Sequence, residues 1–220
     1  MSFTLPSLPK TLSEALGLPG YQQALTVSSK VDSRTAERVS HLTKLLPPAL
    51  TKVSSYLDIG GGNCEITDGI AKTYSIQRSI CSDVYPTSNY KPISNIQYMQ
   101  NVSNTIGLPD QSLDLITAYM VLHHFTDQIR MFSEIRRVLR VGGYLFFREH
   151  DVLSNDMTTI KYLNDYHRQF DPQYPNGPFN YLSRDNLRTY LEQNGFRYIG
   201  SSDYAAKNPQ KIYHSLFIRI

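Results

Sequence analysis

The sequence predicts a three-layer α/β fold in which helices cover both faces of a mainly parallel β-sheet. Between residues 53 and 150, apolar strand-like runs alternate with amphipathic helical stretches, which is typical of strand–helix–strand crossover units. Near the C-terminal end, two strand-like runs follow each other without a helix, which predicts an antiparallel strand at the edge of the sheet. The 220 residues suffice for one such domain with a short extension.

The first fifty residues are expected to form a helical extension before the main domain. Residues 11–14, TLSE, read as a capping box that opens a short helix ending near Gly17. A second helix is expected over residues 32–46, where apolar side chains recur at helical spacing before two prolines. We therefore divide the chain into residues 1–50, a lid or brace, and residues 51–220, the main domain.

The central part of the chain supplies most of the predicted sheet. A continuous apolar run over residues 113–120, LDLITAYM, is typical of a strand that is covered on both faces. Residues 141–143, VGG, are expected to end a helix and lead into the next strand. The full set comprises strands over 53–59, 77–83, 96–99, 113–120 and 144–148, with helices through Ile66, Ile70 and Ala71 and from 126 or 127 to 139.

The last part of the chain combines two helices, a loop and the closing strands. Helices are expected over residues 157–170 and 183–193, the second ending at an Asn-Gly pair. The stretch between them, DPQYPNGPFNY, is rich in proline, glycine and aromatic residues and could cover a site. Strands over 196–200 and 212–218 complete the sheet.

Composition and charge exclude several classes of protein. The net charge of +3 is too small for a dedicated nucleic-acid binder with a basic stripe, and no apolar run is long enough to span a bilayer. The first residues lack the layout of a secretory signal. Two cysteines, Cys64 and Cys81, are too few for a disulfide framework or a cysteine-rich metal site. We therefore expect a cytoplasmic protein.

A glycine-rich turn, YLDIGGGNCEIT, follows the first strand of the alternating region. The dinucleotide-binding fingerprint is G-x-G-x-x-G. Gly60 and Gly62 match its first two glycines, but Glu65 occupies the position of the third. Asp58 adds a second carboxylate, which would repel a diphosphate, and no Gly-Lys-Ser/Thr follows to form a phosphate-binding loop. The turn therefore favours a nucleoside ligand that carries positive charge and no phosphate.

Four segments in order resemble the class I S-adenosylmethionine-dependent methyltransferases. The first motif of that family is D-x-G-x-G-x-G, which Asp58, Gly60 and Gly62 match, with Cys64 where the last glycine is common. The segments ICSDVY, LPDQSLD followed by LITAYMVLHHF, and EIRRVLRVGGYLFFRE resemble the later motifs. The resemblance covers about residues 53–150. It implies a Rossmann-like sandwich with a seven-stranded sheet, mainly parallel with an antiparallel edge strand.

The resemblance also implies S-adenosyl-L-methionine as the cofactor and suggests which residues bind it. Asp58 would hold the methionine end, and Asp83 would accept hydrogen bonds from both ribose hydroxyls. An asparagine would lie near the adenine, with two candidates left open. The remaining implied contacts are Gly60, Gly61, Gly62, Asn101 or Asn104, Met120 and Val121.

Polar residues where the strands end are the candidates for the chemistry of methyl transfer. Glu149 or His150 could take a proton from the acceptor, histidine being best matched to neutral pH. His124 is a third candidate in the acceptor pocket. Because His123 and His124 would point about 100° apart on a helix, they make a poor chelate pair, and no metal site is expected. Tyr119 and Leu122 also replace the glutamates of a metal-binding group of small-RNA methyltransferases.

The expected reaction is methyl transfer to a nitrogen or oxygen nucleophile of a small molecule. The segments MVLHHF and VLRVGG are most similar to those of quinone and metabolite methyltransferases. An RNA methyltransferase, including a cap-directed one, is an alternative supported by the pI of about 8.7 and by Tyr174, Phe179 and Tyr181 for base stacking. A non-catalytic module is the third reading. The sequence indicates no oligomeric state.

Overall fold

The structure, a computed structural model, describes residues 29–46, 53–86, 93, 95–170, 179–202 and 209–220. Its centre is a seven-stranded sheet with the strand order β3-β2-β1-β4-β5-β7-β6. The strands are β1 (Ser55–Ile59), β2 (Arg78–Asp83), β3 (Ile96–Gln100), β4 (Leu113–Tyr119), β5 (Leu139–His150), β6 (Phe196–Ser202) and β7 (Ile212–Arg219).

The directions of the strands confirm the predicted fold class. Strands β1 to β5 pair in parallel, whereas β7 runs antiparallel to both of its neighbours, β5 and β6. The antiparallel strand therefore lies one position inside the edge, and β6 is the edge strand. Since the chain crosses from β3 over to β4 on the other side of β1, the strand order reverses between β1 and β4, which is where ligands bind in such sheets.

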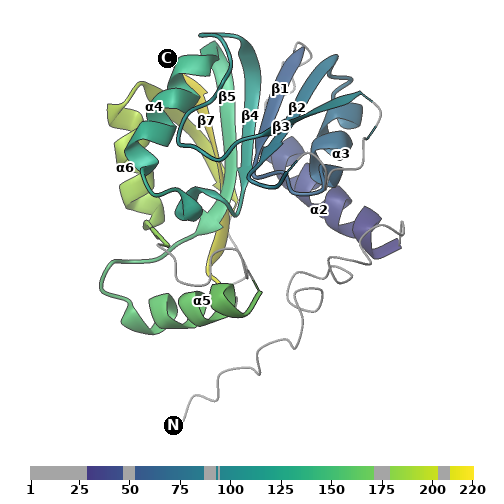
Figure 1. Ribbon diagram of the computed structural model, residues 1–220. Coiled ribbons are helices and arrows are strands. Elements are labelled where there is room, and N and C mark those ends of the chain that lie inside the picture. Colours follow the sequence, from purple (N-terminus) through teal and green to yellow (C-terminus); the bar gives the residue numbers. More distant parts are fainter. Residues whose placement is uncertain (1–28, 47–52, 87–92, 94, 171–178, 203–208) are drawn as a thin grey trace.

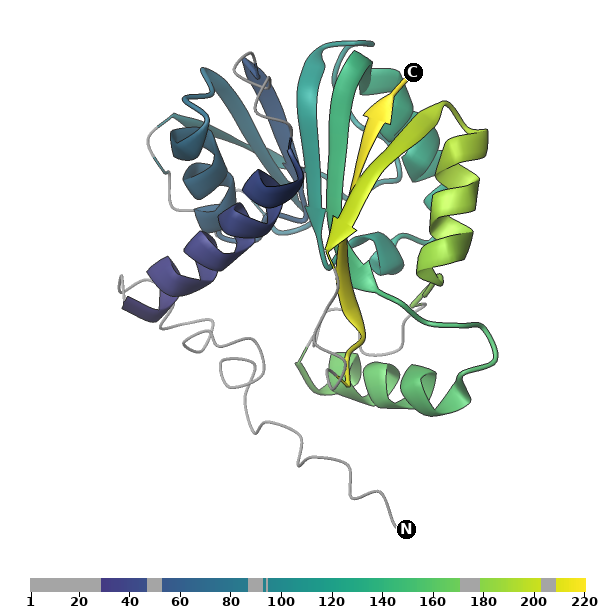
Figure 2. The ribbon, with the colours of Figure 1, turned by 180° about the vertical axis from the view of Figure 1, so that it is seen from behind.

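Helices cover both faces of the sheet, as Figures 1 and 2 show from opposite sides. Helices α2 (Ser29–Leu45) and α3 (Glu65–Thr73) pack on one face, and α4 (Gln128–Val138) and α6 (Arg184–Gln193) pack on the other. A single 3-10 turn, η2 (Leu122–His124), follows β4. Helix α5 (Met157–Phe170) belongs to neither layer and lies past the carboxyl end of β5 in Figure 1.

Two separate cores result because successive side chains of a strand point to opposite faces. On β4, Ile116 and Ala118 join the core under α4 and α6, whereas Leu115 and Tyr119 join the core under α2 and α3. All seven residues of β4 are buried. The continuous apolar run of this strand thus predicted its double cover correctly.

The expectation for residues 141–143 was wrong, because these residues lie inside β5 and do not end a helix. Helix α4 ends at Val138, and Leu139, fully buried, already pairs with Leu113. The pairing then jumps to Leu115 with Tyr144, and Gly142 has a φ of 79°. The glycines therefore serve a bulge in a long strand, a role that Gly fills because it tolerates positive φ.

Helix α2 packs directly on the sheet. Val39 and Leu42 join the core that α3 also covers, and the ring of His41 stacks on His214 of β7 at 4.0 Å between centroids. The expected helix of residues 11–17 and the loop of residues 171–178 lie outside the described residues. In the described part of the chain, no helix combines the length and the apolar character needed to cross a membrane.

A disulfide joins Cys64, just before α3, to Cys81 in β2, with 2.10 Å between the sulfur atoms. The sequence argument that two cysteines are too few for a disulfide framework did not foresee this single bond. Both cysteines are fully buried, and Cys64 has a φ of 62°. The bond fixes the end of the glycine turn to the neighbouring strand.

We expect protein purified without reductant to contain no free thiol. After denaturation, iodoacetamide should add no mass, whereas prior reduction should allow two adducts, which mass spectrometry distinguishes. Cys81→Ser should lower the free energy of unfolding by about 2–4 kcal/mol, the usual effect of opening a loop of this length. Reduction of the wild type should lower its free energy of unfolding by the same amount, as urea unfolding can measure. Two adducts without reductant would contradict the pairing.

Candidate active site

The glycine turn lies at the reversal point of the sheet and is tied to the end of β2. The backbone amides of Gly60 and Gly61 both donate to the carbonyl oxygen of Ser82, at 2.7 and 3.1 Å. Gly60 has a φ of 69°, and a Cβ added there would lie 2.5 Å from Cγ2 of Val121. The segment after β4 therefore lies against the turn, as expected for two parts of one site.

Asp83 at the end of β2 binds the same turn. The amide of Gly62 donates to its Oδ2 at 2.8 Å, and the amide of Val84 donates to its Oδ1 at 2.7 Å. Burial raises the pKa of Asp83, while these backbone amides act in the opposite direction. A Cβ added to Gly62 would meet no atom within 4 Å. The half-buried carboxylate thus stands beside open space, with acceptor capacity left for a ligand.

Asp58, two residues before the turn, is buried under it. Its two oxygens accept hydrogen bonds from the hydroxyls of Thr117, at 2.6 Å, and Thr67, at 2.7 Å. Burial raises the pKa of Asp58 to about 6, and the two hydroxyl donors counteract this rise. At neutral pH, Asp58 is therefore a carboxylate in an apolar setting, which a cationic ligand would stabilise.

The two asparagines that are candidates for the adenine lie in one loop after β3. The amide of Asn101 donates to the carbonyl oxygen of Asp83 at 2.7 Å, and its side chain caps its own loop through Ser103 and Thr105. Asn104 donates from Nδ2 to the hydroxyl of Thr126 at 3.0 Å. Asn101 is thus the nearer of the two to Asp83, and the choice between them stays a prediction.

Met120 and Val121, which follow β4, are expected to line the cofactor, and Val121 lies next to the glycine turn. Met120 has a φ of 58°, unusual for a residue with a side chain, and its amide donates to the carbonyl oxygen of Arg148 at 2.8 Å. This hydrogen bond fixes the exit of β4 against β5. Val121, the next residue, lies against Gly60.

Glu149, near the end of β5, is buried and hydrogen-bonded on both oxygens. Oε1 accepts from the amide of Leu122 at 2.8 Å, and Oε2 lies 2.7 Å from Nδ1 of His123. Burial by itself would raise the pKa of Glu149, but the charge and hydrogen bond of His123 outweigh it and lower the pKa to about 2. The structure thus places Glu149 in contact with Leu122 and His123 of η2. Its role as a base stays a prediction.

The other two catalytic candidates are histidines whose burial disfavours protonation. Nδ1 of His150 lies 2.6 Å from the carbonyl oxygen of Gln210. Burial, followed by the nearby His123, lowers the pKa of His150 to about 3, and the same two causes lower the pKa of His124 to about 3. Both rings are neutral at pH 7, and their part in proton transfer also stays a prediction.

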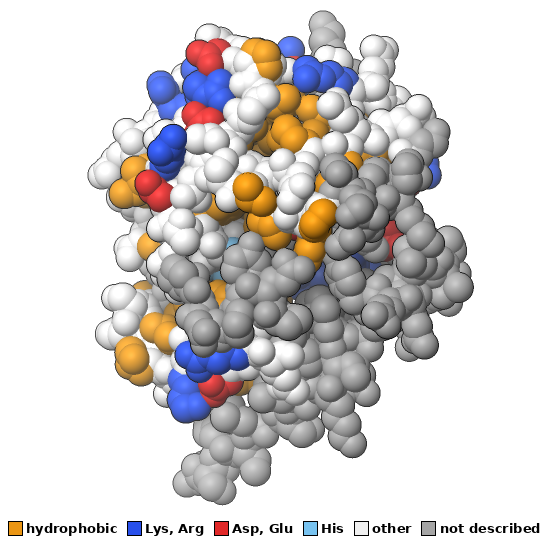
Figure 3. Space-filling view, viewed as in Figure 1, with side chains coloured by type: hydrophobic (Ala, Val, Ile, Leu, Met, Phe, Trp, Pro, Cys, Tyr) orange, Lys and Arg blue, Asp and Glu red, His pale blue; other side chains and the backbone are white. Residues whose placement is uncertain are grey.

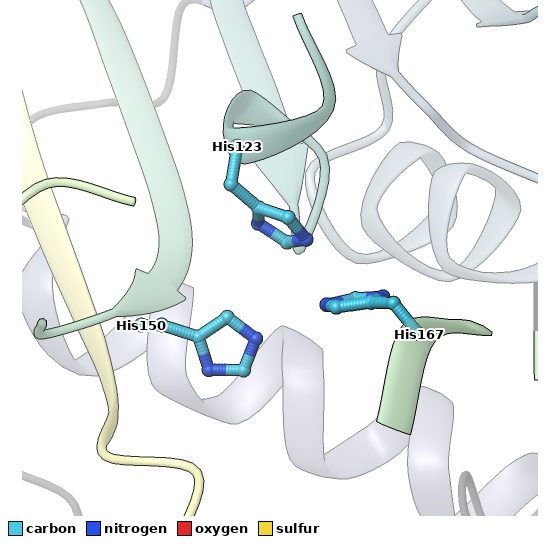
Figure 4. Close-up of side chains that lie close together, drawn as sticks. All are labelled: His123, His150 and His167. Atoms are coloured by element: carbon cyan, nitrogen blue, oxygen red, sulfur yellow. The ribbon is translucent and has the colours of Figure 1, made fainter. Parts of the chain in front are cut away.

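The sequence argument missed His167, which α5 brings to the same place. Figure 4 shows the rings of His123, His150 and His167 around a common space. The centroid of the His123 ring lies 5.1 Å from that of His150 and 4.8 Å from that of His167. A signal was present, because His167 falls on the same helical face as Leu163, which is buried in α5.

Three arginines on the side of α2 were also missed. Burial is the main cause that lowers the pKa of Arg34, Arg38 and Arg148, that of Arg148 to about 9. Arg34 lies 4.0 Å from Glu65, the first residue of α3 after the glycine turn. The site therefore has one cationic group, Arg34, beside the start of α3, as well as the buried carboxylate of Asp58.

Comparison with known proteins agrees with this geometry. A family profile described as a methyltransferase domain matches residues 31–200. The uncharacterized methyltransferase YcgJ of Bacillus subtilis is 29% identical over 84 residues, 38% of this chain and 33% of that protein. The ubiquinone/menaquinone biosynthesis C-methyltransferase UbiE of Hydrogenovibrio crunogenus is 26% identical over 116 residues, 48% of this chain and 46% of that protein. The chain thus spans about a third to a half of these relatives.

Solved structures share the fold over most of their length. An S-adenosylmethionine-dependent methyltransferase from Mesorhizobium loti superposes with a TM-score of 0.65 at 14% identity, covering 86% of this chain and all of that one. A chain of the complex between the Haloferax volcanii Trm112 methyltransferase activator and the putative methyltransferase gives 0.63 at 14% identity, covering 86% and 92%. At such low identity, these likenesses show the fold alone.

Asp58 is expected to make the stability of the ligand-free protein depend on pH. Its folded pKa of about 6 lies above the ordinary value of about 3.9. Its stabilising contribution is therefore fully present below pH ~4 and is lost as the pH rises through ~6. Asp58→Asn, neutral at every pH, should exceed the wild type in free energy of unfolding by about 2–3 kcal/mol at pH 7.5 and match it near pH 4.

Urea unfolding without cofactor at both pH values measures this difference. Asp185→Asn, which changes an exposed carboxylate in the first turn of α6, is the control and should not reproduce it. A difference between Asp58→Asn and the wild type that is the same at pH 4 and pH 7.5 would rule out the titration of Asp58 as its cause.

Proposed function

Because the chain belongs to the family of methyltransferase domains and has the fold of the class I S-adenosylmethionine-dependent methyltransferases, we propose that it methylates a small molecule. The methyl group comes from S-adenosyl-L-methionine and goes to a nitrogen or oxygen nucleophile. The observation that carries this proposal is the pair of carboxylates, Asp58 and Asp83, on either side of a glycine turn that Gly62 leaves open.

The methionine end of the cofactor carries an ammonium, a carboxylate and a sulfonium. In this proposal the buried carboxylate of Asp58 attracts the positive charge, directly or through water. Arg34, next to the start of α3, can pair with the cofactor carboxylate, which the N-terminus of α3 also favours. Opposite charges of the ligand thus meet opposite charges of the protein.

The nucleoside end is assigned to Asp83 and the loop after β3. The backbone amide of Gly62 donates to Oδ2 of Asp83, and that of Val84 donates to Oδ1. These two hydrogen bonds hold the carboxylate in one orientation. A carboxylate oxygen can accept more than one hydrogen bond, so both ribose hydroxyls can bind there. The backbone amide of Asn101 donates to the carbonyl oxygen of Asp83, so Asn101 lies next to Asp83 and would face the adenine.

Methyl transfer is an in-line displacement in which the bond from carbon to sulfur breaks as the acceptor attacks. The sulfonium leaves as a neutral thioether, and the acceptor nitrogen or oxygen must lose its proton. The protein contributes alignment above all. Glu149 and His150, which end β5, and His124, which lies in η2 after β4, stay the predicted proton acceptors.

The surface and the aromatic residues favour a small acceptor over RNA. On the face seen in Figure 3, Lys and Arg stand in separate groups, several beside Asp or Glu. The ion pairs of Arg137 with Asp110 and of Lys161 with Asp165 illustrate this pairing. Phe179 stacks on His167 with 4.7 Å between the ring centroids, so one face of its ring is already in contact with protein. Tyr174 lies outside the described residues.

The cytoplasmic location also stays a prediction.

The test is the transfer of label from methyl-labelled cofactor into metabolite, RNA and protein fractions of a host extract. We expect label in the metabolite fraction. Asp83→Asn should weaken cofactor binding by about 1–3 kcal/mol, the scale of lost charge-assisted hydrogen bonds, as calorimetry can measure. Asp185→Asn should leave cofactor binding and label transfer unchanged.

Each other outcome of this experiment has a defined meaning. Label in the RNA fraction would replace the small acceptor by RNA, including a cap structure. Cofactor binding without any transfer would support a non-catalytic module. No heat with S-adenosylmethionine together with clear heat from a pyridine dinucleotide would overturn the proposal as a whole.

A further inference from the structure

Three histidines from separate elements meet in a buried space past the carboxyl ends of β4 and β5. His123 belongs to η2, His150 ends β5, and His167 lies near the end of α5. Their exposed fractions are only 1%, 2% and 9%. One ring nitrogen from each lies within 4.8 Å of the other two, and Figure 4 shows a nitrogen of each ring turned toward the space between them.

In two of the three rings, those of His123 and His150, an outer hydrogen bond determines which nitrogen faces inward. Nδ1 of His123 lies 2.7 Å from a carboxylate oxygen of Glu149, and Nδ1 of His150 lies 2.6 Å from the carbonyl oxygen of Gln210. Both partners can only accept, so Nδ1 must carry the proton in both rings. In neutral rings, Nε2 then presents a lone pair to the interior of the cluster.

These inward nitrogens have no protein partner. Within the described part of the chain, Nε2 of His123, of His150 and of His167 is buried without a hydrogen bond. A buried polar atom without a partner destabilises a fold, and converging lone pairs repel one another. Three such nitrogens facing one space offer a site for a common electron-pair acceptor.

We propose that His123, His150 and His167 bind a divalent transition-metal ion of the Zn²⁺ type through their Nε2 atoms. Zinc accepts imidazole nitrogens at about 2.0–2.1 Å, which places ligand nitrogens about 3.3–3.4 Å apart in a tetrahedron. Small rotations of the three rings close the present separation of at most 4.8 Å. Three protein ligands leave one position for water, as in zinc sites that are not purely structural.

The surroundings of the cluster fit this chemistry. Histidines that bind metals almost always donate their other ring nitrogen to a carboxylate or a backbone carbonyl, and Glu149 and Gln210 provide one of each. The buried carboxylate of Glu149 also supplies negative charge next to the cation. Because the three ligands are all imidazoles, Mg²⁺ and Ca²⁺, which prefer oxygen, do not fit.

The site departs from the expectation that no metal binds. That expectation considered His123 with its neighbour His124, whereas the cluster combines His123 with β5 and α5. An ion bound there would tie α5, which belongs to neither helical layer, to the end of the sheet. The inference rests on the histidine geometry and does not depend on which acceptor is methylated.

The test uses the full chain purified without a polyhistidine tag and treated with a chelator. Calorimetric titration with Zn²⁺ should give one ion per chain with a Kd below about 1 μM, as expected for three preorganised imidazoles. Millimolar Mg²⁺ should not compete. Co²⁺ should give the intense visible absorption of a tetrahedral site, and Zn²⁺ should displace it.

Variants assign the ligands. His167→Gln should weaken Zn²⁺ binding at least about hundredfold, and Glu149→Gln, which removes the carboxylate behind His123, about 10–100-fold. His41→Gln changes a partly buried histidine on α2, away from the cluster, and should bind like the wild type. Circular dichroism of each variant checks its folding.

Two outcomes would overturn the proposal. One is a wild type that binds no Zn²⁺ and gives no tetrahedral Co²⁺ spectrum, a measurement that needs no variant. The other is a folded His167→Gln protein that binds Zn²⁺ as tightly as the wild type. Cofactor binding by calorimetry, measured on the same metal-free samples, keeps failure of the metal site distinct from failure of the proposed function.

Discussion

The close approach of the glycine turn to the segment after β4 is the constraint on which the site depends. A Cβ at Gly60 would lie 2.5 Å from Val121, and one at Gly61 would lie 2.6 Å from the sulfur of Cys81. The turn is thus held between β4 on one side and β2 on the other. Because β1 lies between these two strands, a bare backbone at its carboxyl end comes close to both neighbours.

The two acids of this site differ because their hydrogen-bond donors differ. Asp58 accepts from the hydroxyls of Thr67 and Thr117 in a fully buried position, so its negative charge is poorly solvated. Asp83 accepts from backbone amides at the half-buried end of β2. In the proposed function, the first environment would stabilise a cation brought by a ligand, and the second would orient a carboxylate for hydroxyl groups. One nucleoside with a positively charged tail would satisfy both.

Local sequence patterns predicted most helices and strands, but they did not predict contacts between residues that are distant in sequence. The apolar run of β4 indicated its buried position, and the bounds of α5 were predicted to the residue. The role of Gly142 was missed because a bulge depends on the register with β4. The Cys64–Cys81 bond and the approach of His167 to His123 join elements that are distant in sequence. Residue spacing indicated at most that His167 shares a helical face with the buried Leu163, and it carried no signal for the partners across the fold.

The histidine cluster bears directly on which group can accept a proton during methyl transfer. Both oxygens of Glu149 already hold η2, one through Leu122 and the other through His123. A metal ion would occupy Nε2 of His150, while its Nδ1 is held by Gln210, so His150 would have no nitrogen left to act as a base. Of the three residues predicted from the sequence, Glu149 and His124 would then keep that role. Loading the cluster with metal and using His150 as the base therefore exclude each other.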